Sequence, residues 1–123
     1  MNALKQVREL KTLDQLHLTP RQQQALVELR ERLSGGFDIE QLTLYGSVSR
    51  GEADEESDMD LLIITRRLLH RRIRHQITDI VFEVNLKYDT NLSTLVVDRE
   101  SWEGGVFSLL PVQDEILREG IPF

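Results

Sequence analysis

The spacing of hydrophobic positions changes along the chain, and each change predicts an element. Residues 20–33 predict a helix, because leucines recur at helical spacing behind the capping sequence Thr19-Pro20-Arg21-Gln22. The glycine pair at positions 35–36 should end this helix. A shorter and weaker helical pattern precedes it, carried by Leu4, Val7 and Leu10.

Three short apolar runs then predict strands at 39–45, 58–65 and 92–97. The second run is continuously apolar, which indicates a strand buried on both faces. Between the last two strands, residues 68–87 repeat apolar positions every three or four residues and predict a helix. A last helix, broken by glycine and proline, is expected within 101–120. This order predicts an α/β domain with a small mixed sheet and helices packed mainly on one side.

The length of 123 residues indicates one domain, spanning 1–123. A composition of 40% hydrophobic and 29% charged residues is that of a globular protein. No apolar run approaches the roughly 20 residues of a membrane helix, and the first residues do not form a secretory signal. The absence of cysteine excludes disulfides and thiolate chemistry, so we expect a cytoplasmic protein without a membrane partner.

The charge is unevenly distributed. The net value of 15 − 21 = −6 does not favour a general affinity for nucleic acid. Acidic residues crowd into 52–60, and a basic cluster follows the 58–65 strand. Such a basic face is either solvated or a contact for phosphate, nucleic acid or an acidic partner. The basic cluster consists of Arg66, Arg67, Arg71, Arg72 and Arg74.

The candidate site combines a Gly46-Ser47 turn with a pair of aspartates at the start of the next strand. Asp58 and Asp60 project from one face, because the side chains of a strand alternate. Two adjacent carboxylates repel each other unless a cation or a proton lies between them. The turn can offer backbone N–H groups and a hydroxyl to an anion. These residues indicate a magnesium-nucleotide site; the alternative is a loop with a capping serine and solvated acids.

The motif itself resembles that of a known family. Residues 44–51 read Leu-Tyr-Gly-Ser-Val-Ser-Arg-Gly, and residues 57–63 read Ser-Asp-Met-Asp-Leu-Leu-Ile. Together they are similar to the signature of the DNA polymerase beta-like nucleotidyltransferase superfamily, and more narrowly to its minimal nucleotidyltransferases. The resemblance implies the nucleotidyltransferase fold and transfer of a nucleoside monophosphate from a triphosphate, with ATP the expected donor.

Carried onto this chain, the resemblance assigns roles to individual residues. Gly46 and Ser47 would hold the β- and γ-phosphates, and Asp58 and Asp60 would bind two Mg2+ ions and act as the catalytic residues. Arg50 either binds a phosphate or pairs with a neighbouring glutamate. Magnesium suits such a site, because it prefers oxygen ligands and keeps part of its shell for phosphate and water.

The family also supplies a third carboxylate from a later strand, to activate the attacking hydroxyl. The 92–97 strand contains no acid. None of the acids near it is well placed by its spacing, so this part of the catalytic set stays open. The nearby acids are Asp79, Glu83, Asp89 and Asp98.

Two further functions remain beside the magnesium-dependent enzyme that acts on a protein or a small molecule. The resemblance also implies an antitoxin-like module that pairs with a small helical HEPN-type toxin. Because no third acid is assigned, a catalytically weak protein that only binds nucleotide is the other alternative. A chain this short needs a helical partner or a homodimer to recognise the acceptor.

Overall fold

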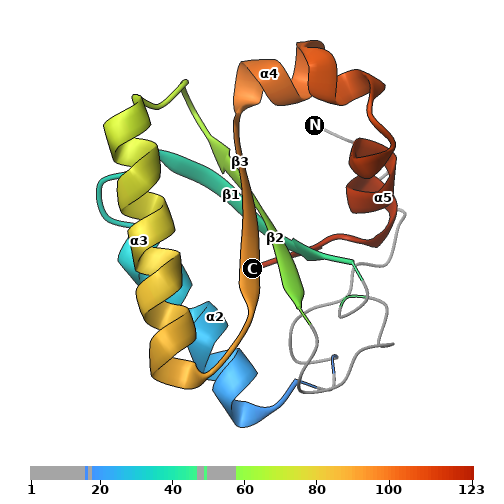
Figure 1. Cartoon of the computed structure of the whole chain (residues 1–123). Helices are drawn as coiled ribbons and strands as arrows, with labels where there is room; N and C mark the ends of the chain where they lie inside the picture. Colours follow the sequence, from blue (N-terminus) through green and yellow to red (C-terminus); the bar gives the residue numbers. More distant parts are fainter. Residues whose placement is uncertain (1–15, 17, 47–48, 50–57) are drawn as a thin grey trace.

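The computed structural model describes residues 16, 18–46, 49 and 58–123 (Figure 1). A four-stranded sheet lies between two groups of helices. The elements in chain order are α2 (Pro20–Leu33), β1 (Ile39–Tyr45), β2 (Met59–Thr65), α3 (Arg71–Tyr88), β3 (Leu92–Asp98), α4 (Arg99–Gly104), the 3-10 helix η2 (Val106–Leu109), α5 (Pro111–Glu119) and β4 (Ile121–Pro122).

The sheet is mixed, with the strand order β3-β2-β1-β4. Strand β1 runs antiparallel to both of its neighbours, whereas β2 and β3 are parallel. The register places Asp60 of β2 between Tyr45 of β1 and Ser93 of β3. Paired residues point to the same face, so these three side chains share one side of the sheet.

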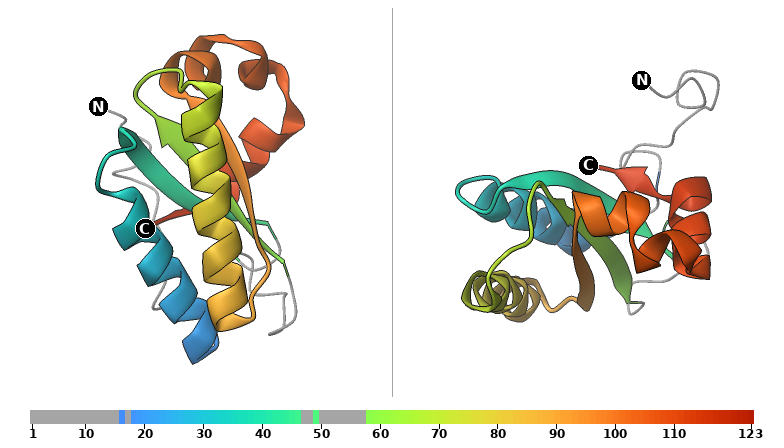
Figure 2. Two further views of the ribbon diagram at one scale, coloured as in Figure 1. Left: turned by 60° about the vertical axis from the view of Figure 1, so that its left-hand side comes forward. Right: turned by 90° about the horizontal axis from the view of Figure 1, so that it is seen from above.

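One face of the sheet is covered by α2 and α3, as both views in Figure 2 show. Strand β2 contributes Leu61 and Ile63 to this core, and α2 contributes a stripe of leucines. Helix α2 begins as its sequence indicates: the Thr19 hydroxyl accepts from the N–H of Gln22, whose side chain accepts from the N–H of Thr19. The fully buried leucines of α2 are Leu26, Leu29 and Leu33.

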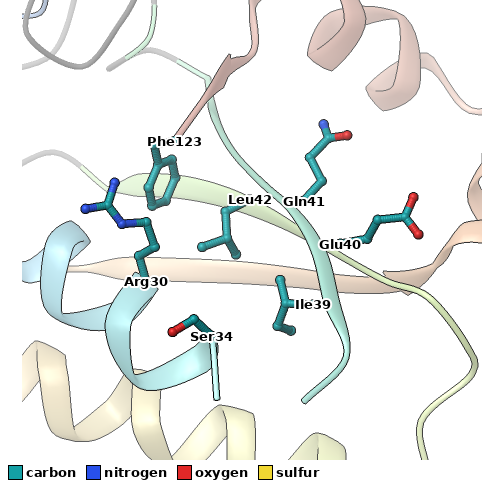
Figure 3. A pocket seen from close by; sticks show the side chains of 7 residues that line it. All are labelled: Arg30, Ser34, Ile39, Glu40, Gln41, Leu42 and Phe123. Atoms are coloured by element: carbon teal, nitrogen blue, oxygen red, sulfur yellow. The ribbon is translucent and has the colours of Figure 1, made fainter. Parts of the chain in front are cut away.

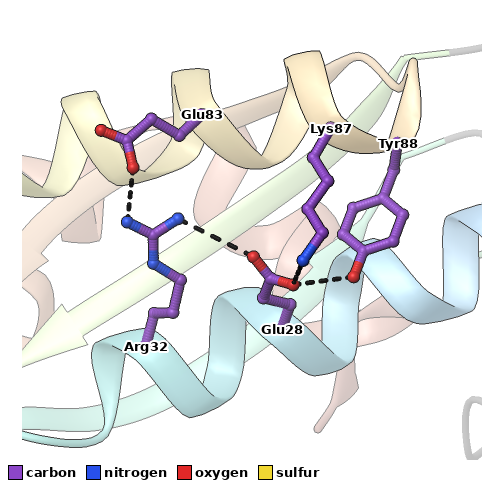
Figure 4. A network of polar contacts seen from close by, with 5 residues as sticks. All are labelled: Glu28, Arg32, Glu83, Lys87 and Tyr88. Atoms are coloured by element: carbon purple, nitrogen blue, oxygen red, sulfur yellow. Dashed lines mark hydrogen bonds and ion pairs between the residues drawn. The ribbon is translucent and has the colours of Figure 1, made fainter.

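Helices α2 and α3 are also joined by a polar network on their outer side (Figure 4). The Glu28 carboxylate accepts hydrogen bonds from Lys87 Nζ and the Tyr88 hydroxyl, both at 2.7 Å. These two contacts hold the pKa of Glu28 below its usual value. Arg32 bridges to Glu83 at 2.6 Å. The network fixes one side of the α2–α3 pair, and its acids are already engaged there.

The opposite face of the sheet carries a smaller core beneath α4, η2 and α5. Alternation along β2 turns Leu62 and Ile64 toward this side, where they pack with Trp102 and Ile116. Strand β2 is therefore buried on both faces, as its continuous apolar sequence predicts. Asp60 lies on this same second face, two residues before Leu62.

The element bounds agree closely with the sequence pattern, with a few differences. Helix α3 begins at Arg71, because the His70 side chain accepts from the N–H of Arg72 and caps it. The last helix is divided into α4, η2 and α5, and β3 extends to Asp98. The short β4 pairing was not expected from sequence. The helix expected around Leu4–Leu10 lies outside the described residues.

Helix α3 is the longest described helix, with 18 residues. Its exposed side carries charged residues, including Arg71 and Arg72. Across the ranges that the structure describes, no helix is both long enough and apolar enough to cross a membrane.

Candidate functional site

Strand β1 ends at a glycine that lies against the strand beside it. Gly46 has φ +84°, a left-handed conformation that favours glycine. A β-carbon at this position would lie only 2.6 Å from Oδ2 of Asp60. Position 46 therefore requires glycine for its conformation and for the space that the Asp60 carboxylate occupies.

The two aspartates of the motif lie together at the start of β2. Asp58 is exposed just before the strand, and Asp60 is half-buried within it. Burial is the main reason that the pKa of Asp60 lies above its usual value, and the charges of Asp58 and Glu115 raise it further. The aspartates thus form a like-charged pair, one member of which is partly removed from water.

Two more polar side chains face this pair. Tyr45 lies directly across from Asp60 in the β1–β2 register. Burial raises the pKa of the Tyr45 hydroxyl, and the charges of Asp60 and Glu115 add to the effect. The charge of Glu115 of α5, which follows Asp60 by 55 positions in the sequence, therefore acts on both groups. No sequence signal pointed to Glu115, because only the packing of α5 on the sheet brings it here.

Ser47, Arg50 and most of the acidic run 52–60 lie outside the described residues, so the contacts expected of them are not described. Within the described ranges, no three acidic, histidine or cysteine side chains gather closely enough to hold a metal ion by themselves. A pair of carboxylates is nevertheless a sufficient protein contribution for magnesium, which completes its shell with phosphate oxygens and water.

Three of the four acids named from sequence are held in other contacts, and the fourth, Asp79, is exposed on α3. Glu83 pairs with Arg32 across α2 and α3. Asp89 ends α3 in a left-handed conformation and pairs with Arg21 of α2 at 3.2 Å.

Asp98 lies at the opposite end of β3 from the Asp60 pairing. Its carboxylate caps α4 by accepting from the N–H and hydroxyl of Ser101, which lowers its pKa. At the position on β3 beside Asp60, the chain carries Ser93. Strand β3 therefore supplies no acid to the candidate site.

The basic cluster does not join the aspartates. It lies around the end of β2 and the start of α3, and the five residues from Asp60 to Thr65 separate it from Asp60 by about 17 Å. Arg67 pairs with Asp38 at 3.1 Å, and Arg74 donates to the carbonyl of Val96. Two of the arginines thus have structural contacts at this distant end.

A pocket of about 210 Å3 opens beside the far half of β1 (Figure 3). Its lining comes from α2, β1 and the last residue of the chain. Gln41 lies four residues before Tyr45 on β1, which corresponds to about 13 Å along the strand. The pocket is therefore separate from the aspartate pair. Its lining residues are Arg30, Ser34, Ile39, Glu40, Gln41, Leu42 and Phe123.

The fold and the site define a class of α/β domains in which two aspartates at the start of one strand lie beside a required glycine at the end of the neighbouring strand. The model of the nucleotidyltransferase domain family matches residues 24–116 of the chain. The chain belongs to this family, and the resemblance found in the sequence motif is confirmed.

Two relatives from Methanocaldococcus jannaschii carry descriptive names. The chain is 45% identical over 65 residues to "Putative protein adenylyltransferase MJ1305", which covers 51% of this chain and 44% of that protein. It is 34% identical over 58 residues to "Putative protein adenylyltransferase MJ0141", which covers 47% and 59%. The chain thus spans about half the length of the curated relatives it matches.

Two solved structures are similar in fold. A structure of a toxin-antitoxin with AMP-PNP superposes with a TM-score of 0.54 at 15% identity, covering 85% of this chain and 72% of that one. A structure described as a "putative minimal nucleotidyltransferase" gives a TM-score of 0.52 at 22% identity, covering 83% and 89%. These similarities confirm the fold class expected from the sequence.

Proposed function

We propose that the chain is a magnesium-dependent nucleotidyltransferase that moves AMP from ATP to a hydroxyl of a protein acceptor. The observation that carries this proposal is the close association of Gly46, Asp58 and Asp60 at the adjoining ends of β1 and β2. Family membership supports the reaction class. The names of the two curated relatives support adenylyl transfer to protein.

The residues present fit a magnesium-nucleotide complex. The charge of Asp58 disfavours ionisation of the half-buried Asp60, and a divalent cation between the two carboxylates would relieve this repulsion. The absence of a side chain at Gly46 leaves the Asp60 carboxylate and the adjacent backbone accessible. Asp58 and Asp60 would hold the metal, which when bound neutralises charge on the reacting phosphates.

The other motif residues complete the proposal. Gly46 lets the chain approach the triphosphate closely, and Ser47 would donate to its β- and γ-phosphates. Arg50 would bind a phosphate oxygen. Tyr45 stays protonated because its pKa is raised, so its hydroxyl can donate a hydrogen bond to a polar group bound beside Asp60.

The proposal is tested by transfer of label from ATP labelled at the α-phosphate. Purified protein, magnesium and candidate acceptors are incubated, with the protein encoded by the neighbouring gene as the first acceptor. We expect an acceptor to become labelled by the wild type and not by Asp58→Ala/Asp60→Ala. The double variant Glu83→Ala/Asp89→Ala is the control, because it also removes two acids but from the α2–α3 side. Equal labelling by the first double variant and the wild type would refute the assignment.

A second candidate function is that of an antitoxin-like module that binds a small helical protein. The toxin-antitoxin structure with the same fold supports this candidate. Elements η2 and α5 also expose apolar side chains that a partner could cover. Val106, Leu109 and Leu117 are 63%, 83% and 55% exposed. Co-purification with the neighbouring gene product, compared between wild type and Leu109→Glu, tests it; equal recovery would count against this surface.

A further inference from the structure

The unassigned third acid of the proposed reaction has a candidate on a helix rather than on a strand. We propose that Glu115 of α5 supplies the carboxylate that accepts the proton of the attacking hydroxyl. This inference rests on the proposed nucleotidyl transfer and names a residue that acts in it. Four observations of the fold support it.

The first observation is that the position on β3 beside Asp60 carries no acid. Strand β3 runs parallel to β2, and its residue beside Asp60 is Ser93. A serine hydroxyl has a pKa far above that of a carboxyl group and cannot replace one as a proton acceptor at neutral pH. Within the described residues, the acid on the Asp60 side must therefore come from another element.

The second observation is that α5 is fixed over the face that carries Asp60. Ile116 is 4% exposed and packs in the small core with Leu62 and Ile64. These two side chains lie on the same face of β2 as Asp60. Val112 and Tyr45 pack against the same core. Glu115 precedes Ile116 and follows Val112 by three residues, so it lies beside the anchored stripe of the helix.

The third observation is that Tyr45, which lies opposite Asp60 in the sheet, packs against the same core as Ile116, the neighbour of Glu115. Beside this packing, the charge of Glu115 adds to the effect of burial in raising the pKa of both Asp60 and Tyr45. Glu115 is itself half-buried, unlike its neighbour Asp114, which is exposed. Glu115 therefore approaches the site from the α5 side, although within the described residues it does not form a three-acid metal cluster with the aspartates.

The fourth observation is that three of the four acids named from sequence are engaged. Glu83 and Asp89 pair with arginines of α2, and Asp98 caps α4. Among the described residues, no hydrogen bond or ion pair is made by the Glu115 side chain. Its carboxylate can therefore accept a proton from a group bound in the site.

The acceptor oxygen forms a bond to the α-phosphorus of ATP, and the bond from that phosphorus to the bridging oxygen of the β-phosphate breaks. Pyrophosphate leaves with the electron pair of the broken bond. The hydroxyl proton passes to the Glu115 carboxylate and then to solvent. In this step Glu115 would accept the proton, whereas Asp58 and Asp60 would hold the nucleotide through the metal.

The location of Glu115 is tested without nucleotide or metal. In a Tyr88→Phe background, Tyr45 is the only tyrosine, because the chain contains two. Its ionisation can then be followed by ultraviolet absorbance. We expect Glu115→Gln to lower the pKa of Tyr45, because it removes a nearby negative charge, while the matched variant Asp114→Asn leaves it unchanged. An unaltered Tyr45 pKa in Glu115→Gln would overturn the placement and the proposal with it.

The catalytic role is tested by kinetics of label transfer. We expect Glu115→Gln to lower kcat by about 10²- to 10⁴-fold, the usual contribution of a general base, with little change in the affinity for magnesium-ATP. The combined variant Ser93→Asp/Glu115→Gln should regain much of the lost rate, because it restores an acid beside Asp60. Thermal unfolding of each variant checks that it is folded.

The outcomes separate this inference from the proposed function. Full activity of Glu115→Gln, with loss of activity in Asp58→Ala/Asp60→Ala, would overturn the role of Glu115 and leave the nucleotidyltransferase intact. A failure of Ser93→Asp to restore any rate would also count against proton transfer by Glu115. No label transfer and no magnesium-ATP binding by the wild type would overturn both.

Discussion

The backbone of Gly46 lies against the carboxylate of Asp60, so that a β-carbon at position 46 would come within 2.6 Å of Oδ2. This relationship joins the turn after β1 to the aspartate strand β2. It explains why the motif needs glycine at this point for two separate reasons, the positive φ and the adjacent carboxylate.

Gly46→Ala should therefore destabilise the protein and impair the site. The left-handed conformation costs a residue with a β-carbon about 1–2 kcal/mol, and the carboxylate of Asp60 must also move. Gly36→Ala is the matched control, since Gly36 has φ +117° but no atom within 4 Å of the added carbon. We expect both variants to unfold at lower denaturant concentration, but only Gly46→Ala to lose magnesium-ATP binding. Normal binding by Gly46→Ala would contradict the proposed role of the contact.

Asp60→Asn should raise the melting temperature of the protein in the absence of magnesium. The change removes a half-buried charge that lies beside Asp58 and Glu115. Asp114→Asn on the exposed side of α5 serves as the control and should have a smaller effect. Differential scanning calorimetry measures the difference. A lower melting temperature for Asp60→Asn would mean that the aspartate makes a stabilising contact in the metal-free protein.

Ile116→Ala should loosen the second face of the sheet. Ile116 is almost fully buried in a core of only five buried side chains, and removal of its methyl groups should cost about 2–5 kcal/mol. Leu109→Ala, at a position 83% exposed, should change the stability by much less. Urea unfolding compares the two. Equal effects would show that α5 is not anchored through Ile116.

Asp98 should contribute to stability at neutral pH and lose this contribution in acid. Its pKa is lowered in the folded state by the hydrogen bonds from Ser101, so the unfolded chain binds its proton at a higher pH. The contribution is complete above the ordinary value of 3.8 and disappears as the pH falls through the lower folded value.

Asp98→Ala should accordingly cost about 1 kcal/mol at pH 7, as loss of a helix cap does. The difference from the wild type should shrink as the pH is lowered below 4. Asp98→Asn, which keeps a capping oxygen, is the control and should be less destabilised at pH 7. Urea unfolding at several pH values measures these differences, and a gap that stays constant down to pH 2 would contradict the capping role.

The sequence predicted the parts of the fold that depend on local patterns. The Thr19–Gln22 capping box and the continuously apolar β2 are clear signals, because each depends on neighbouring residues alone. Strand β4 has only two residues, and its pairing with Thr43 and Leu44 arises from tertiary packing. A pair of residues that short carries no periodicity from which a strand can be recognised.

The candidate site likewise contains residues that the sequence predicted and a residue that it did not. Asp58, Asp60 and Gly46 form one motif, so their association follows from a strand and a turn close in sequence. Glu115 could not be found in this manner, because the fold of α5 onto β1 and β2 brings it to the site from a remote position. Asp98 was named from sequence only as a nearby acid that is not well placed by its spacing, and it lies at the end of β3 opposite to the Asp60 pairing.

The most direct test of the central claim is a calorimetric titration with ATP, which needs no knowledge of the acceptor. We predict that the wild type binds ATP in the presence of magnesium and only weakly without it, and that Asp58→Asn/Asp60→Asn loses this magnesium dependence. Glu83→Gln/Asp89→Asn should bind as the wild type does. Identical magnesium-dependent binding by the wild type and Asp58→Asn/Asp60→Asn, or no binding by the wild type under either condition, would contradict the account.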